Sequence, residues 1–89
     1  MSYKLQIFNL HKWEKDLSTI PEKEKKKIAS KIRGLKIEPW PDGIQVKKLT
    51  NHDIADFRLR VGDYRILFIR DQETHTIKLL HVRHRSKAY

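Results

Sequence analysis

Residues 57–68 constrain the fold of this chain more than any other segment. Residues 57–61 read FRLRV and residues 64–68 read YRILF, so two strand-like runs are separated only by Gly62 and Asp63. A two-residue connection with Gly first is typical of a β-hairpin turn, and it pairs Val61 with Tyr64. With a side-chain period of two, one face of the hairpin collects apolar side chains: Phe57, Leu59, Val61, Tyr64, Ile66 and Phe68. The segment therefore predicts a hairpin with one face buried in a core.

The opposite face of the same hairpin collects arginines. Arg58, Arg60 and Arg65 share it, with Arg60 directly opposite Arg65. Like charges in that position destabilise a sheet by about 0.2–1 kcal/mol, so a function that needs them is the favoured explanation. Asp56 has the same parity and is able to pair with one of them. Exposed arginine pairs also occur on proteins that bind nothing there, and this plain alternative stays open.

The charge of the whole chain points in the same direction. The 89 residues carry 20 Lys and Arg against 11 Asp and Glu, a formal net charge of +9, which favours a polyanionic partner such as nucleic acid. Most lysines lie in the first half, including the run at 25–27, and are typical of a solvated helix face. Arg, which contacts phosphate bidentately, dominates after Phe57. The Cys-free composition excludes a disulfide framework, and no apolar run is long enough to span a bilayer, so a cytoplasmic protein is expected.

The remaining elements complete an α+β domain over residues 1–89. Alternation predicts a strand at 3–7, and helical spacing predicts a helix at 10–18 capped by Asn9. A second helix is expected at 20–35, where Thr19 has capping-box spacing, and the short link favours an antiparallel helix hairpin. Further strands are expected at 45–49, 55–61, 64–70 and 76–83. The chain should thus place a strand and two helices on a mainly antiparallel sheet of four to five strands.

The last strand has apolar residues of both parities, so its register is ambiguous. One register places His81 and Arg83 on the arginine-bearing face, and the other places Lys78 and Leu80 there. His81 and His84 point to opposite sides of a strand, and neither has a neighbouring carboxylate in sequence. We therefore predict no metal site and no cofactor. A basic tail follows, in which residues 84–89 read HRSKAY.

These motifs together resemble the RelE/ParE superfamily of bacterial toxins. The resemblance rests on FRLRVGDYRI at 57–66, the HRSKAY ending, Trp13, and the PWPDG segment at 39–43 that precedes residues 46–49. It spans nearly the whole chain, and the RxGDYR and HRxxxY patterns are specific in combination. The resemblance implies a small sheet with an N-terminal helix hairpin, which agrees with the element order above.

The resemblance also implies an activity and a set of residues. RelE-type members cut mRNA in the ribosomal decoding site without metal, by attack of a 2′-OH on the adjacent phosphate. By position, the implied catalytic residues are Arg58, Arg60, Arg65, Arg83, His84 and Tyr89. Basic residues expected to bind RNA are Lys47, Lys48, Arg85 and Lys87. Tyr89 would be a base or a stacking platform, and His84 is an easier acid than Arg83 because arginine rarely gives up its proton.

The resemblance implies partners and leaves rivals open. An acidic antitoxin, mRNA and the ribosome are the expected partners, in a toxin–antitoxin hetero-oligomer. Some ribonuclease members use a Glu base, and the carboxylates that would need to be placed are Glu38, Asp53 and Asp56. The superfamily also contains gyrase inhibitors of the ParE type, which share the fold without cutting RNA. A non-catalytic basic RNA-binding module is the third possibility.

Overall fold

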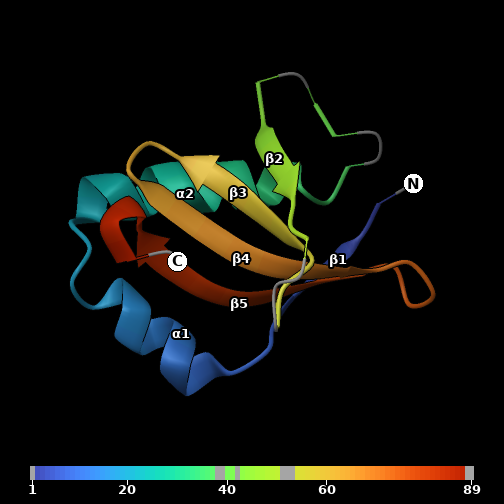
Figure 1. Cartoon of the computed structure of the whole chain (residues 1–89), viewed down its shortest axis with the longest axis horizontal. Coiled ribbons are helices and arrows are strands. Elements are labelled where there is room, and N and C mark those ends of the chain that lie inside the picture. The colour runs from blue at the N-terminus through green and yellow to red at the C-terminus, as the bar shows by residue number, and fades with distance from the viewer. Residues whose placement is uncertain (1, 38–39, 42, 51–53, 88–89) are drawn as a thin grey trace.

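Two helices and a five-stranded sheet form the described part of the protein, as Figure 1 shows for a computed structural model. The structure describes residues 2–37, 40–41, 43–50 and 54–87. The elements are β1 (Lys4–Ile7), α1 (Leu10–Leu17), α2 (Glu22–Gly34), β2 (Gln45–Lys48), β3 (Phe57–Val61), β4 (Tyr64–Asp71), β5 (Thr76–His84) and the 3-10 turn η1 (Arg85–Lys87). The strand order is β1-β5-β4-β3-β2, with β1 parallel to β5 and the other neighbours antiparallel. The predicted α+β architecture is confirmed.

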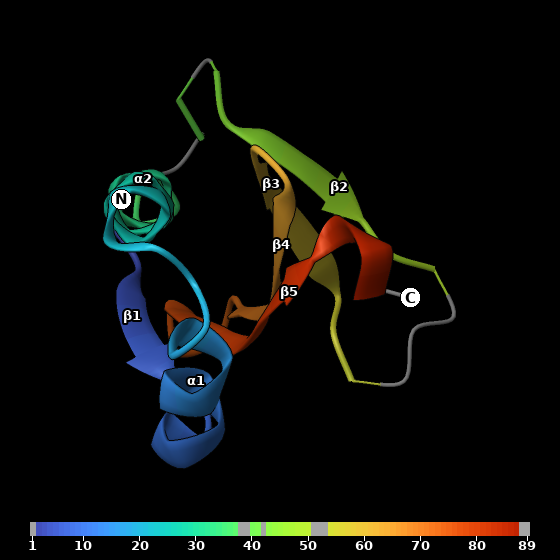
Figure 2. The ribbon, with the colours of Figure 1, turned by 90° about the vertical axis from the view of Figure 1, so that its left-hand side faces the viewer.

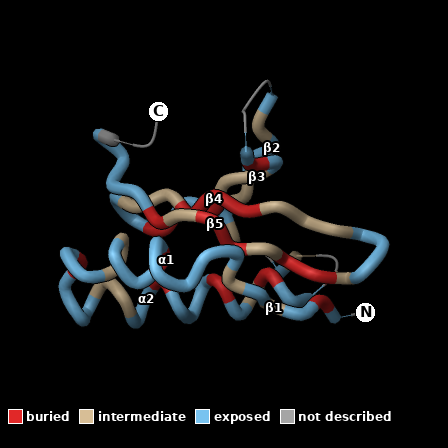
Figure 3. The backbone as a smooth tube through the Cα atoms, turned by 90° about the horizontal axis from the view of Figure 1, so that it is seen from below, coloured by how far each residue is buried: buried red, intermediate tan, exposed pale blue. Residues whose placement is uncertain are grey.

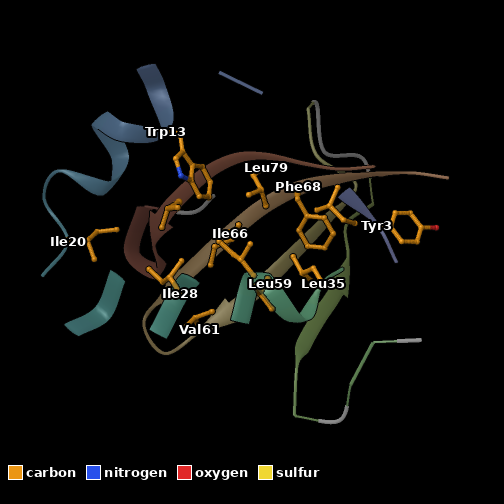
Figure 4. Close-up of a cluster of buried hydrophobic side chains, with 13 residues drawn as sticks. Tyr3, Trp13, Ile20, Ile28, Leu35, Leu59, Val61, Ile66, Phe68 and Leu79 are labelled. Carbon is orange, nitrogen blue, oxygen red and sulfur yellow. The ribbon is translucent and has the colours of Figure 1, made fainter. Parts of the chain in front are cut away.

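Both helices cover the same face of the sheet, and η1 lies on the other side (Figures 2 and 3). The chain runs out along α1 and returns along α2, as a helix hairpin should (Figure 1). Between helices and sheet lies one apolar core, to which α1 contributes Trp13 and α2 contributes Ile28 and Ile32 (Figure 4). Leu59 and Ile66 meet them from the sheet, each with no exposed surface. The face that the helices cover is called the core face below.

The two helices begin differently. Asn9 caps α1 as predicted, because its Oδ1 accepts the backbone N–H of Lys12 at 3.1 Å. The capping box expected at Thr19 is wrong, since α2 begins at Glu22 with Pro21 at its N-cap and no side-chain cap. Ile20 is buried in the core, so the link is fixed by apolar packing.

The central hairpin has the predicted register. Val61 pairs with Tyr64 and Arg60 with Arg65, on either side of a turn in which Gly62 has φ +57°. That positive φ suits glycine at the first turn position. The apolar parity of both strands therefore faces the helices, and the arginine parity faces away from them.

The last strand follows neither of the two simple registers. A β-bulge opposite Leu67 and Phe68 leaves Leu80 without a partner, because Leu67 pairs with His81 while Phe68 pairs with Leu79. The extra residue breaks strict alternation, so side chains before and after it reach the same face. Both sets of residues that were treated as alternatives, Lys78 with Leu80 and His81 with Arg83, share the face opposite the core.

Candidate nucleic-acid interface

A row of basic side chains crosses the sheet on the face opposite the core. Along this row Gln45 pairs with Arg60, Arg60 with Arg65, and Arg65 with Arg83, so three arginines stand on three adjacent strands. Neighbouring strands are about 4.8 Å apart, which holds these guanidinium groups within reach of one phosphodiester. No residue of this row is acidic. We call it the arginine row.

A second row runs beside the first. In it Lys47 pairs with Arg58, Arg58 with Leu67, and Leu67 with His81. The two rows are one side-chain repeat apart, so Lys47 and Arg58 extend the basic surface of the arginine row toward the edge strand β2. The predicted cluster of Arg58, Arg60, Arg65 and Arg83 is thus brought together on one face.

Arg65 is the most firmly held member of the arginine row. Its Nη1 donates to the carbonyl oxygens of Gly62 and Tyr64, both at 3.1 Å. These bonds tie the side chain to the hairpin turn and leave it half-buried, whereas Arg60 and Arg83 are exposed. A guanidinium fixed before a ligand arrives loses less conformational entropy on binding, so Arg65 is the natural anchor of an anion.

Helix α1 protects the edge of β5 where β1 ends. β1 pairs with β5 only as far as Leu79, which leaves the following backbone groups of β5 without a neighbouring strand. Asp16 of α1 reaches this edge, and its Oδ2 accepts the backbone N–H of Val82 at 3.1 Å. The same oxygen is 3.1 Å from Nδ1 of His81. A carboxylate therefore replaces the missing strand and fixes an imidazole beside it.

A groove of about 690 Å³ follows this edge of β5, with α1 as its other wall. Its lining includes the charged or titratable residues Lys12, Lys15, Asp16, Tyr64, His81, Arg83 and His84. Arg83 belongs both to this groove and to the arginine row, so the two basic features are continuous. A second groove, between α2 and the β3–β4 turn, includes Lys26, Lys27, Lys31 and Arg60.

His84 leaves the strand on the side opposite Arg83. It pairs with Tyr64 and meets that ring edge-on, with the ring centroids 5.5 Å apart. Its Nδ1 is 3.0 Å from the hydroxyl of Ser86 and accepts the backbone N–H of Ser86 at 3.3 Å. His84 is therefore outside the arginine row but lines the groove at the edge of β5.

The tail is attached to the central hairpin. The backbone N–H of Arg85 donates to the carbonyl of Asp63 at 2.7 Å, and its Nε lies 3.7 Å from the Asp63 carboxylate. Arg85, expected to bind RNA, is thus engaged with the turn. Lys48 pairs with Phe57, on the parity opposite Lys47. Lys87 ends η1, while Tyr89, Glu38 and Asp53 lie outside the described residues, and Asp56 directly precedes β3.

Arg70 shows that not every arginine of the second half serves the basic face. It lies on the core parity of β4, where its guanidinium stacks 4.8 Å from the ring centres of both Tyr3 and Trp40. Such cation–π contacts join the residue that precedes β1 to the segment before β2. The abundance of arginine after Phe57 therefore has two causes, one structural and one concerned with the exposed face.

The sequence did not indicate the Asp16–His81 pair, because 65 positions separate its members. Nothing in the sequence singles out Asp16, because α1 carries two lysines and a second acid, Glu14. Within the described part of the chain, no three His, Cys, Asp or Glu side chains cluster as a metal site would require. None of the described helices is long and apolar enough to cross a membrane.

Comparison with known proteins adds to this description. No protein-family model and no curated protein sequence matches the chain. Among solved structures, the archaeal RelE–RelB complex from Pyrococcus horikoshii is similar with 28% identity, 99% of this chain and 100% of that chain covered, and a TM-score of 0.76. The RelBE2 toxin–antitoxin complex from Mycobacterium tuberculosis is similar with 26% identity, 98% and 95% coverage, and a TM-score of 0.76.

A third similarity is to the RelB–RelE complex from Methanococcus jannaschii, at 24% identity, 94% coverage of both chains and a TM-score of 0.68. By its fold and its two basic rows, the chain is a small α+β protein with cationic side chains on the open face of its sheet. More particularly, the chain has the RelE fold and is RelE-like. The resemblance predicted from its sequence is confirmed.

Proposed function

We propose that this protein is the toxin of a toxin–antitoxin pair and that it cleaves mRNA on the ribosome in the cytoplasm. The observation that carries the proposal is the arginine row, in which Arg60, Arg65 and Arg83 stand side by side on three adjacent strands. Opposed like charges destabilise the sheet, and a row of cations is suited to stabilise the negative charge of a pentacoordinate phosphorane. Similarity to RelE proteins solved in complex with RelB supports the same role.

The proposed reaction needs no metal. A 2′-OH attacks the neighbouring phosphorus, the bond from phosphorus to the 5′ oxygen breaks, and the products are a cyclic phosphate and a 5′-OH. Arg58, Arg60 and Arg65 stabilise the negative charge that develops on the phosphoryl oxygens. His84 is the proposed acid, Arg83 adds positive charge in the arginine row next to Arg65, and Tyr89 remains the proposed base or stacking residue.

RNA on either side of the scissile phosphate is proposed to follow the basic surface. Lys47 stands next to Arg58 in the second row, and the groove beside α2 offers further lysines next to Arg60. Lys48, Arg85 and Lys87 are proposed as outer contacts. Since these contacts are to the phosphate backbone, binding should weaken steeply with salt.

Cleavage mapping tests the proposal. Purified protein is incubated with mRNA, with and without programmed ribosomes, beside Arg65→Ala and the matched control Arg33→Ala on α2. We expect cuts in the decoding site only with ribosomes, a loss of about 10²–10³ in rate for Arg65→Ala, and wild-type rates for the control. Cuts without ribosomes would indicate a free ribonuclease. No cuts, combined with inhibited DNA supercoiling, would replace the proposal with a gyrase inhibitor.

We further propose that an acidic antitoxin covers the basic surface. The described residues offer it apolar contacts as well, because Phe8 and Ile54 are 66% and 49% exposed beside a groove that also contains Ile69 and Leu80. An acidic chain with apolar side chains complements both properties. Coexpression should give a stable hetero-oligomer that elutes without nucleic acid, and Ile54→Asp should weaken it. Unchanged affinity of Ile54→Asp would refute this placement of the antitoxin.

A further inference from the structure

His81 is held in one tautomer. Its Nδ1 lies 3.1 Å from Oδ2 of Asp16, and that same oxygen accepts the backbone N–H of Val82 at 3.1 Å. The amide is a fixed donor, so this oxygen acts as an acceptor and the proton shared with His81 resides on Nδ1. A neutral imidazole with its proton on Nδ1 carries its free lone pair on Nε2. Asp16 thus prepares His81 to accept a proton.

His81 is also placed where a proton acceptor is useful. It lines the groove at the edge of β5 and also the groove that contains Phe8 and Ile54, and 16% of its side chain is exposed. It has the parity of Arg83, two residues further along the strand, and Arg83 pairs with Arg65 of the arginine row. Side chains two residues apart on one strand face are about 7 Å apart, the span of one nucleotide's phosphate and ribose.

His84 presents the complementary arrangement in the same groove. Its Nδ1 receives the backbone N–H of Ser86 at 3.3 Å and lies 3.0 Å from the Ser86 hydroxyl. The neutral ring therefore carries its proton on Nε2. When the ring is protonated, the hydroxyl is able to accept from Nδ1–H, because a hydroxyl both donates and accepts. The two histidines of one groove are thus held with opposite ring nitrogens protonated.

We infer that His81, oriented by Asp16, is a catalytic general base that works opposite His84 across this groove, on an RNA phosphodiester bound beside Arg83. Nε2 of His81 takes the proton of the 2′-OH as the 2′ oxygen bonds to phosphorus. The bond to the 5′ oxygen breaks, and that oxygen takes a proton from Nε2 of protonated His84. His81 then releases its proton to water, and His84 takes one up. Asp16 acts through His81 and is a positioning residue.

This inference rests on the proposed ribonuclease function and assigns the base within it to His81, which leaves Tyr89 the stacking role. A carboxylate that fixes the tautomer of a histidine and stabilises its protonated form is a general device of acid–base catalysis. Here the device joins β5 to α1, and α1 contributes no residue to the arginine row.

The first test does not depend on activity. Nitrogen NMR of the imidazole rings in the free protein should show His81 protonated at Nδ1 and His84 protonated at Nε2 in their neutral forms. Asp16→Asn retains an oxygen for both donors and should preserve the tautomer of His81, whereas Asp16→Ala should release it. A His81 ring protonated at Nε2 in the wild-type protein would overturn the inference.

The second test measures cleavage under single-turnover conditions. His81→Gln should lower the rate about 10²–10⁴-fold and remove the acidic limb of the pH–rate profile, while His11→Gln on the exposed side of α1 should cleave like wild type. The cleavage rate of Asp16→Asn should lie between the rates of His81→Gln and His11→Gln. Melting temperatures identify any variant that fails to fold, and Asp16→Asn then supplies the decisive comparison.

The outcomes separate the two proposals. A wild-type protein that cleaves, together with a folded His81→Gln that cleaves equally well with an unchanged pH profile, overturns the role of His81 alone. A wild-type protein that cuts no RNA with or without ribosomes overturns the proposed function, and the base role falls with it.

Discussion

The arginine row should make the protein less stable than it would be without its charge. Arg60 and Arg83 each stand directly across from Arg65, so Arg60→Gln and Arg83→Gln each remove one pair of opposed like charges. Both side chains are exposed, so neither substitution opens a cavity. We therefore expect both variants to be more stable than wild type and less active in RNA cleavage.

The size of the gain follows from the sheet geometry. Guanidinium groups about 7 Å apart repel by about 0.6 kcal/mol in water, within the range of about 0.2–1 kcal/mol for opposed like charges. Arg60 and Arg83 are two strands apart, about 10 Å, so their effects should nearly add. The double variant should gain about 0.4–2 kcal/mol in free energy of unfolding.

Urea unfolding at low and high salt measures this gain. Lys4→Gln is the control, because Lys4 is an exposed strand cation whose partner is the uncharged Thr76. The excess gain over this control should be largest at about 10 mM salt and mostly vanish at about 1 M, where charges are screened within about 3 Å. Repeating Arg60→Gln in an Arg65→Gln background should abolish its effect. The reasoning would be refuted if Lys4→Gln raised the free energy of unfolding as much as Arg60→Gln and Arg83→Gln do, or if the increase did not depend on salt.

Three further predictions concern stability. A hydrogen bond from the backbone N–H of Thr74 is the largest cause that lowers the pKa of Asp71 below its ordinary value of 3.8. The ionised Asp71 carboxylate therefore stabilises the fold fully above pH 3.8, and this contribution is lost as the pH falls further. Asp71→Asn should make stability less dependent on pH between about pH 5 and 1, as measured by acid unfolding followed by circular dichroism. Arg70→Ala removes the guanidinium stacked on Trp40 and should lower the free energy of unfolding, measured in urea, by about 1–3 kcal/mol. A decrease near zero would contradict the cation–π role. Asn9→Ala removes the cap of α1 and should lower the free energy of unfolding in urea by about 1 kcal/mol, whereas Asn9→Asp keeps a capping oxygen and should retain most of it.

Local patterns were enough to predict much of the fold. Alternation and the Gly62–Asp63 turn predicted the register of β3 and β4, and Asn9 predicted the start of α1, because each signal involves residues close in sequence. The same logic failed at Thr19, where burial of Ile20 decides how the chain enters α2. It also failed in β5, since a bulge depends on the partner strand and leaves no local signature.

The site divides in the same way. The cluster of Arg58, Arg60 and Arg65 follows from parity within one hairpin, and a sequence is sufficient to find it. The pairing of Asp16 with His81 depends on where β1 stops, because only an uncovered edge of β5 lets α1 approach it. Contacts of that kind are set by tertiary structure and become visible only in three dimensions.

The bulge at Leu80 also bears on how such a protein can change over time. It divides β5 into a first half that is fixed by β1 and the core, and a second half that ends in the charged groove and the tail. Strict alternation would couple the two halves, so that a residue gained or lost in one would invert every side chain in the other. An irregular position between them is a place where a residue gained or lost near the tail can be absorbed, while the half of β5 that pairs with β1 keeps its register.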